Sequence, residues 1–308
     1  DLLYSVAVPA TSGYQTMLKN IGSIENQGYE LSIESDNLTG AFSWTTAFNI
    51  AFNRNKVLEL GGEEYKEMAE GDGHLKTGSV RRLIVGEPIG VFYGYRFDGI
   101  FQNEEECKQQ TSSASPIGVG LRRYKDLNGD GKVDAANDRE ILGDANPKFF
   151  GGLTNTFAYK GFELNVFLQY SYGNKILNYN AMELENPTGG QNAYADMVNR
   201  WTPENPSNIY PKATTNRALL VSDRFIEDGS YLKLKTLSLS YSFPKINLKH
   251  IQGLRLYVTG QNLLTWTKYR GYDPEVSYRG ASTLEAGEDF GGYPQSRTFM
   301  FGIKLDIK

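Results

Sequence analysis

Acidic residues at alternating positions in the stretch KDLNGDGKVDAANDREILGD, residues 125–144, have the types and spacing needed to bind a metal ion. A calcium loop places oxygen ligands at its positions 1, 3, 5, 7 and 9 and a glycine at position 6. The residues at those ligand positions, the fourth acting through its backbone carbonyl, are Asp126, Asn128, Asp130, Lys132 and Asp134, and Gly131 stands at position 6. The spacing therefore predicts a Ca²⁺ site that stiffens a loop.

The second half of this loop departs from the pattern. Position 12, which should supply a two-oxygen carboxylate, is Asn137, and the acid follows one residue later as Asp138. A non-helical exit could absorb the extra residue, or the insertion could weaken the site. Alternatively, Asn128-Gly129 and Asp130-Gly131 form two consecutive turns whose acidic side chains accept hydrogen bonds from nearby amides. None of these interpretations makes the loop catalytic.

Little else in the sequence points to enzyme chemistry. The chain has two histidines and one cysteine, and its serines lie in no nucleophile-elbow motif. The glycines near residue 60 are not followed by the residues of a phosphate-binding loop, so no organic cofactor is expected. A net charge of -4, with no basic block, lacks the electrostatic footprint of a nucleic-acid-binding protein. We predict a protein that is not an enzyme and does not bind nucleic acid.

Long segments of alternating apolar and polar residues surround the polar loop. AFSWTTAFNIAFN (residues 41–53) keeps this period of two for 13 residues, and 162–172 and the C-terminal tail repeat it. A strand of a soluble sheet runs for about five or six residues, whereas a tilted membrane strand needs about 9 to 11. The pattern therefore predicts an all-β fold, an antiparallel transmembrane β-barrel portion with its apolar face toward lipid.

Seven strands follow from this alternation, at residues 27–36, 41–53, 148–159, 162–172, 231–243, 253–266 and 295–307. Short turns (37–40, 160–161 and 244–249) alternate with long connections, as in barrels with short periplasmic turns and long extracellular loops. The strands before Arg54 and after Lys148 are expected to run in opposite directions, so the connection between them can hold either no further span or two. Seven to nine strands are therefore expected. We interpret residues 86–101 as a hairpin above the membrane.

The connection at 173–228 is too long to be structureless, and it is rich in aromatic residues. Flat rings there could stack on sugars or peptides, or could pack the loop against itself. The candidate substrate-binding residues are Tyr179, Tyr194, Trp201 and Tyr210. In the preceding long connection, Arg81 and Arg82 are interpreted as solvated loop charge.

Five segments in order carry a family resemblance: NIGSIENQGYELSI (20–33), NGDGKVD (128–134), ILGDANPKFFGGLTNTFAYKGFELNVFLQYSYG (141–173), LRLYVTGQNLLTWTKYRGYDPEV (254–276) and YPQSRTFMFGIKL (293–305). Together they resemble the C-terminal part of the barrel in SusC/RagA-family TonB-dependent outer-membrane transporters. The resemblance implies a plugged barrel of about 22 strands, of which residues 1–308 would form the C-terminal segment. The plug domain and the N-terminal strands are expected to come from another piece of the same protein.

The resemblance also implies a function and partners. It implies import of oligosaccharides, or peptides, across the outer membrane of a Gram-negative cell, with no bond of the substrate broken. The implied partners are a SusD-like surface lipoprotein, the TonB complex reached through the missing N-terminal region, and outer-membrane lipid. Two alternatives stay open: a soluble calcium-binding, carbohydrate-binding β domain, and a siderophore-type TonB-dependent receptor. Dependence on detergent would separate the soluble domain from the others.

Overall fold

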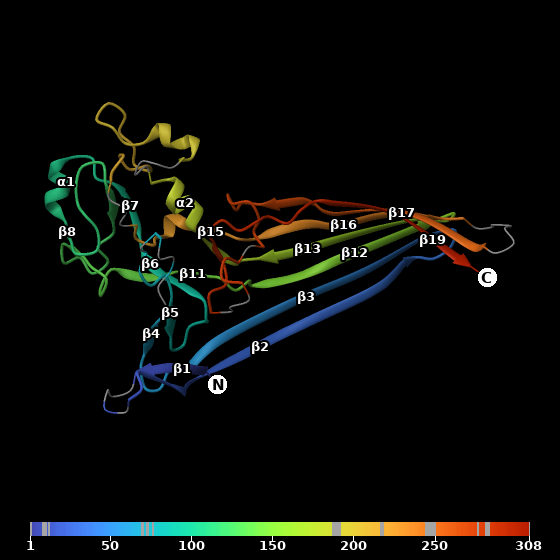
Figure 1. Cartoon of the computed structure of the whole chain (residues 1–308), viewed down its shortest axis with the longest axis horizontal. Helices are drawn as coiled ribbons and strands as arrows, with labels where there is room; N and C mark the ends of the chain where they lie inside the picture. Colours follow the sequence, from blue (N-terminus) through green and yellow to red (C-terminus); the bar gives the residue numbers. More distant parts are fainter. Residues whose placement is uncertain are drawn as a thin grey trace.

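One antiparallel sheet runs the length of the molecule (Figure 1). The computed structural model describes residues 2–7, 11, 13–68, 71, 74–75, 77–186, 192–215, 219–243, 251–275, 277–280 and 284–307. Within these residues the sheet has eight strands, in the order β1 (Leu2–Ala7), β2 (Thr16–Leu38), β3 (Phe42–Glu59), β12 (Phe149–Tyr159), β13 (Phe162–Tyr172), β16 (Tyr231–Ser242), β17 (Ile251–Thr267) and β19 (Thr298–Ile307). The predicted all-β, antiparallel fold is confirmed.

The register of these strands keeps like residues in rows across the sheet. One row contains Trp44, Phe157, Leu164, Leu239, Val258 and Phe301. A neighbouring row on the opposite face contains Thr45, Thr156, Asn165, Ser238, Thr259 and Met300. The period of two in each strand therefore adds up to one apolar face and one mostly polar face.

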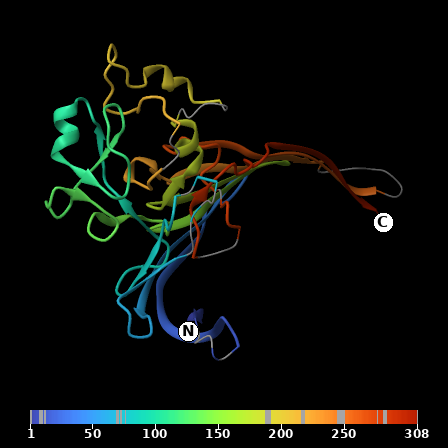
Figure 2. The same ribbon diagram turned by 60° about the vertical axis from the view of Figure 1, so that its left-hand side comes forward.

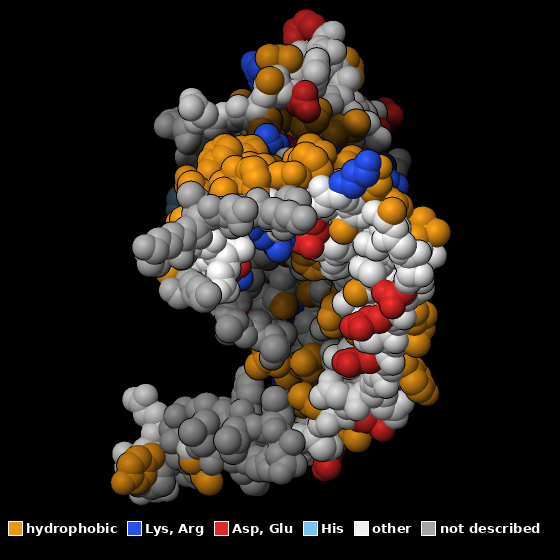
Figure 3. All heavy atoms as spheres, turned by 90° about the vertical axis from the view of Figure 1, so that its right-hand side faces the viewer, with side chains coloured by type: hydrophobic (Ala, Val, Ile, Leu, Met, Phe, Trp, Pro, Cys, Tyr) orange, Lys and Arg blue, Asp and Glu red, His pale blue; other side chains and the backbone are white. Residues whose placement is uncertain are grey.

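The apolar face is exposed. Tyr29, Phe299, Phe301 and Ile303 each leave between 64% and 82% of their surface uncovered, with Phe301 at 81%. Seen along the strands, the sheet curves into an open arc with hydrophobic side chains along its outer edge (Figure 3). A contiguous apolar surface of this size on the convex side suits contact with lipid.

The arc has two free edges. The edge strands are β1 and β19, which lie at its opposite ends and do not pair with each other in the described part of the chain (Figure 2). Unpaired backbone N–H and C=O groups are not tolerated at a sheet edge exposed to hydrocarbon. A sheet of this kind is complete in lipid only when further strands pair with both of its edges.

Some strand boundaries differ from the prediction. The strands β2 and β3 pair as far as Ser23 and Glu59, so both continue well past the predicted segments 27–36 and 41–53. In the extensions, charged residues such as Glu25, Arg54 and Lys56 occupy positions on the side that is apolar elsewhere in the strands, so the alternation stops there. The strand β1 was not predicted at all.

Long connections gather at one end of the sheet and tight turns at the other (Figure 1). Lys160 and Gly161 both have positive φ, 45° and 86°, as a two-residue hairpin turn requires. The predicted turn at 244–249 lies outside the described residues. The described residues of the long connections 60–148, 173–230 and 268–297, which we call the cap, fold together around three apolar clusters. The largest cluster, which we call the apolar core, contains residues from all three connections. The predicted asymmetry of short and long connections is confirmed.

The cap contains short elements only. They are β4 (Tyr65–Glu67), β5 (Arg82–Ile84), β6 (Val91–Tyr95), β7 (Phe97–Ile100), α1 (Glu104–Gln109), β8 (Thr111–Ser112), β9 (Arg122–Tyr124), β10 (Lys132–Val133), β11 (Arg139–Asp144), β14 (Lys175–Asn178), α2 (Tyr179–Leu184), η2 (Ala195–Asn199), η3 (Asp223–Phe225), β15 (Ile226–Asp228) and β18 (Glu288–Asp289). No helix in the described residues is long and apolar enough to cross a membrane.

Two predictions about the first long connection need correction. Residues 86–101 are not a hairpin, because β6 pairs with β11 and β7 pairs with β9. No strand in the described residues between Arg54 and Lys148 joins the large sheet beyond the end of β3, so the choice of zero further spans is the one observed. Arg81 and Arg82 are not solvated: they are 2% and 9% exposed, and each guanidinium lies over an aromatic ring.

Candidate functional site

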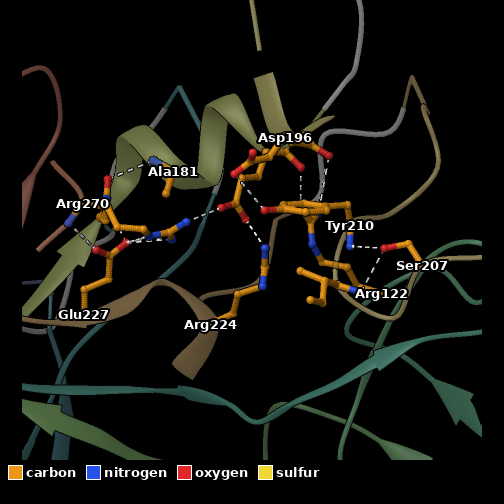
Figure 4. Close-up of polar contacts among 12 residues, drawn as sticks. Arg122, Ala181, Asp196, Ser207, Tyr210, Arg224, Glu227 and Arg270 are labelled. Carbon is orange, nitrogen blue, oxygen red and sulfur yellow. Dashed lines mark hydrogen bonds and ion pairs between the residues drawn. The ribbon is translucent and has the colours of Figure 1, made fainter. Parts of the chain in front are cut away.

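A cluster of charged side chains lies in the cap at the end of α2 (Figure 4). Its centre is Glu185, the C-cap residue of that helix. Three arginines reach it from elements far apart in sequence: Arg122 from β9, Arg224 from η3 and Arg270 from the connection after β17. We call Glu185, these three arginines and Glu227 the Glu185 cluster.

Glu185 is almost fully buried, with 1% of its side chain exposed, and both carboxylate oxygens are engaged. Arg224 Nη2 donates to Oε2 at 2.5 Å and Arg270 Nη1 donates to Oε1 at 2.8 Å. Arg270 Nε also donates to Glu227 Oε1 at 3.0 Å. Burial lowers the pKa of Arg270, but hydrogen bonds to the two glutamates outweigh burial, and the pKa is raised on balance.

Arg122 has no such carboxylate. Its Nη2 donates to the backbone carbonyl of Glu185 at 3.0 Å, and its Nη1 to Asn186 Oδ1 at a long 3.5 Å. The Glu185 cluster thus holds three guanidinium groups and two carboxylates, and both carboxylates are used by Arg224 and Arg270. An excess of one positive charge remains, and it lies on the most deeply buried of the three arginines.

The structure corrects two of the four predicted substrate-binding aromatics. Tyr179 is fully buried in the apolar core of the cap, with its hydroxyl 3.3 Å from Glu288. Trp201 is 9% exposed, and its indole N–H donates to Gln102 at 3.0 Å. Neither ring presents a face to solvent, so both residues pack the cap instead of offering a stacking surface.

The other two predicted aromatics keep part of their surface exposed. Tyr194 packs at the margin of the apolar core. Tyr210 lies beside the Glu185 cluster, with the Arg224 guanidinium 5.2 Å from its ring centre and its hydroxyl donating to Asp196 at 3.3 Å (Figure 4). Substrate binding by Tyr194 and Tyr210 stays a prediction.

The arginines and Glu185 were not among the residues predicted from sequence. They come from all three long connections, and even Glu185 and Arg224, which share one connection, are 39 residues apart, so local spacing carries no signal for them. They become a group only because the three long connections fold against one another.

The first half of the predicted calcium loop is closed by its own hydrogen bonds. The carboxylate oxygens of Asp126 accept from the backbone N–H groups of Gly129 and Gly131, both at 2.7 Å. Asn128 and Asp130 bond to each other through the side-chain amide at 2.9 Å and through the backbone at 3.2 Å.

The second half of the loop is held by the displaced acid. Asp138 is fully buried and accepts from the N–H groups of Leu127 at 2.8 Å and Asp134 at 2.7 Å. Lys132 donates to the Asp134 carboxylate at 3.0 Å. In the described part of the chain, no three acidic, histidine or cysteine side chains form a group that could hold a metal ion. The turn interpretation accounts for these bonds, and calcium binding stays a prediction.

If the loop binds Ca²⁺, the ion should slow amide hydrogen exchange across residues 126–138. We expect a weak site, with a dissociation constant of about 10⁻⁴ to 10⁻³ M, because one ligand is displaced. The comparison is between the full-length protein in detergent with millimolar Ca²⁺ and with EGTA. Asp126→Ala should remove the difference, and Asp98→Ala, outside the loop, should keep it. Equal exchange in both buffers would leave only the turn interpretation.

The sequence is similar to those of known outer-membrane receptors. No protein-family model matches the chain. It is 39% identical over 312 residues to TonB-dependent receptor P3 of Formosa agariphila, covering 99% of this chain and 31% of that protein. It is 28% identical over 321 residues to the TonB-dependent receptor SusC of Bacteroides thetaiotaomicron, covering 100% of this chain and 29% of SusC.

Solved structures agree on the fold. The RagAB peptide importer in its open-open state superposes with a TM-score of 0.77 at 24% identity, covering 99% of this chain and 31% of that one. The chain spans about a third of the length of the relatives it matches. It therefore belongs, as a segment of that extent, to the SusC/RagA-like TonB-dependent receptors.

Proposed function

We propose that the full-length protein imports an oligosaccharide, or a peptide, across the outer membrane with energy supplied through TonB. The observation that carries this proposal is the pairing of an open arc with an exposed apolar face and a folded cap at one end only. Further strands of the same protein would close the arc into a barrel, and a plug domain would fill it. In this arrangement the cap faces the outside of the cell and meets the substrate first.

A SusD-like surface lipoprotein is the proposed partner at the cap. The support is similarity to SusC and to the RagAB peptide transporter. The cap residues carry binding contacts but no catalytic group in this proposal, so the substrate enters unchanged.

The import proposal is tested in the native cell by measuring uptake of labelled oligosaccharides and labelled peptides. We expect uptake of one of the two classes to fall to background when either this gene or TonB is deleted. Complementation with the full-length gene is the control. Uptake that survives loss of TonB would contradict the proposal.

Partner binding is tested by mass spectrometry of the detergent-extracted complex. We expect this segment to be recovered together with plug-bearing sequence and a surface lipoprotein. Recovery of a lone, water-soluble chain would instead favour the calcium-binding, carbohydrate-binding β domain.

A further inference from the structure

The guanidinium of Arg122 is buried without a counter-ion. The residue is 9% exposed. Among the described residues, its Nε has no hydrogen-bond partner and no carboxylate forms an ion pair with it. Its bonds are the carbonyl of Glu185 at 3.0 Å and the long contact to Asn186 at 3.5 Å. A buried, unpaired charge costs free energy unless some partner compensates it.

Arg224, whose guanidinium lies by the same Phe225 ring as that of Arg122, also has an unmet donor. In the described residues four buried side-chain atoms lack a partner, and three of them are Arg122 Nε, Arg224 Nε and the Ser222 hydroxyl. The two guanidinium groups lie 5.7 Å and 5.8 Å from the ring of Phe225. Burial lowers the pKa of Arg122, and the positive charge of Arg224 lowers it further, although Tyr124 and Glu185 oppose this. The one carboxylate among these groups, Glu185, is already bonded to Arg224 and Arg270.

A small pocket adjoins Arg122. It has a volume of about 30 Å³, room for more than a single water molecule. Ser115, Pro116, Tyr124 and Pro211 are among the residues that line it with Arg122, and none of the lining residues is acidic. The sequence next to the lining residues Asn186 and Thr214, residues 187–191 and 216–218, contains no acid either. The pocket thus combines one free cationic donor with neutral walls.

We propose that this pocket binds a carboxylate group of the imported substrate, with Arg122 as its main cationic contact. The free Nε and the remaining guanidinium hydrogens offer the side-by-side donors that a carboxylate accepts in two parallel hydrogen bonds. The carboxylate belongs either to a uronic acid in an oligosaccharide or to a peptide. The proposal rests on the proposed import function, since it assigns the anion to the imported molecule.

Calorimetry on the full-length protein in detergent tests the pocket directly. The probes are a short oligogalacturonate and its methyl ester, and a peptide without acidic side chains and its C-terminal amide. We expect the acid form of one pair to bind about tenfold or more tightly than its neutral form, as loss of a charged hydrogen bond predicts. The pair that shows the difference identifies the source of the carboxylate. If neither pair shows it, the proposal is wrong.

Arg122→Gln should abolish the preference for the acid form. Arg123→Gln is the matched control, because Arg123 is the next residue of the same strand, pairs with Asp98 at 2.9 Å and does not line the pocket. Arg123→Gln should keep the preference. An acid preference that survives Arg122→Gln would overturn the proposal.

Thermal unfolding separates a binding role from a structural one. Because Arg122 makes no ion pair, Arg122→Gln should leave the unfolding midpoint unchanged or raise it. A fall as large as that of a variant that breaks a buried ion pair would make Arg122 a structural residue and contradict the proposal.

The carboxylate pocket and the import function can fail separately. TonB-dependent uptake without a preference for the acid form would refute the pocket alone, whereas binding of the acid form without uptake would refute import alone.

Discussion

Replacing Glu288 by alanine should destabilise the cap by about 3 to 5 kcal/mol, the usual cost of leaving one partner of a buried ion pair alone. Arg81 and Glu288 are each 2% exposed at the side chain, and Arg81 Nε donates to Glu288 Oε1 at 2.9 Å. Burial lowers the pKa of Arg81, and the Glu288 carboxylate is the main group opposing that shift. Without the carboxylate, a charged guanidinium would remain against the ring of Phe92 with only two backbone carbonyls as partners.

The loss should appear as faster native-state hydrogen exchange of core amides in β6 and β14, which reports local opening of the cap. Glu67→Ala is the matched control, because Glu67 also pairs with arginines but is 39% exposed at the side chain. We expect an effect below about 1 kcal/mol there. The double variant Arg81→Met/Glu288→Leu should recover most of the stability, since an apolar pair of similar volume replaces the ion pair. Equal effects of Glu288→Ala and Glu67→Ala would contradict this account.

The large sheet could be predicted from sequence because its determinants are local. Within the apolar band each strand alternates by itself, so Phe162 to Tyr172 was found with the observed limits. The alternation of apolar and polar residues ends where the strands extend past the apolar face of the sheet. The predicted β2 and β3 are too short for this reason. In β1, six residues with little alternation gave nothing to detect.

The cap could not be predicted because its determinants are long-range. Arg81 and Glu288 are 207 residues apart, and Arg122 meets residues more than 60 positions away. Whether an aromatic ring faces solvent is likewise decided by the whole cap, and so Tyr179 was mistaken for a binding residue. The loop at 126–138 is the exception, because its bonds join residues close in sequence.

Replacing Lys233 by methionine should release the connection after β17 from strand β16, which carries Lys233. Lys233 is 2% exposed, and its Nζ donates to Asp273 at 2.6 Å and to Glu275 at 2.5 Å. Since Asp273 is itself 6% exposed, the substitution leaves a buried carboxylate with backbone partners only. We expect the free energy of local opening of this connection to fall by about 3 kcal/mol.

Lys235→Met is the matched control for Lys233→Met. Lys235 donates to the same Glu275 carboxylate at 2.8 Å, but it is 27% exposed at the side chain and does not contact Asp273. Its loss should therefore cost less than about 1 kcal/mol. Hydrogen exchange of amides at 269–275 measures both effects, and equal protection in the two variants would show that Lys233 does not anchor the connection.

Acid should reproduce the effect of Lys233→Met in the unchanged protein. Burial raises the pKa of Asp273 and of Glu275, but their hydrogen bonds, with the bond from Lys233 the largest contribution, outweigh burial, and both pKa values lie below the ordinary 3.8 and 4.5. Carboxyls with lowered pKa values stabilise the folded state above their unfolded values and lose that contribution as the pH falls through the folded ones. Protection at 269–275 should thus be constant near neutral pH and fall progressively below about pH 4.5, after correction for intrinsic exchange rates. In Lys233→Met the lysine no longer lowers the two pKa values, so the fall in protection should be shallower. An unaltered profile would exclude this ion-pair network as the anchor.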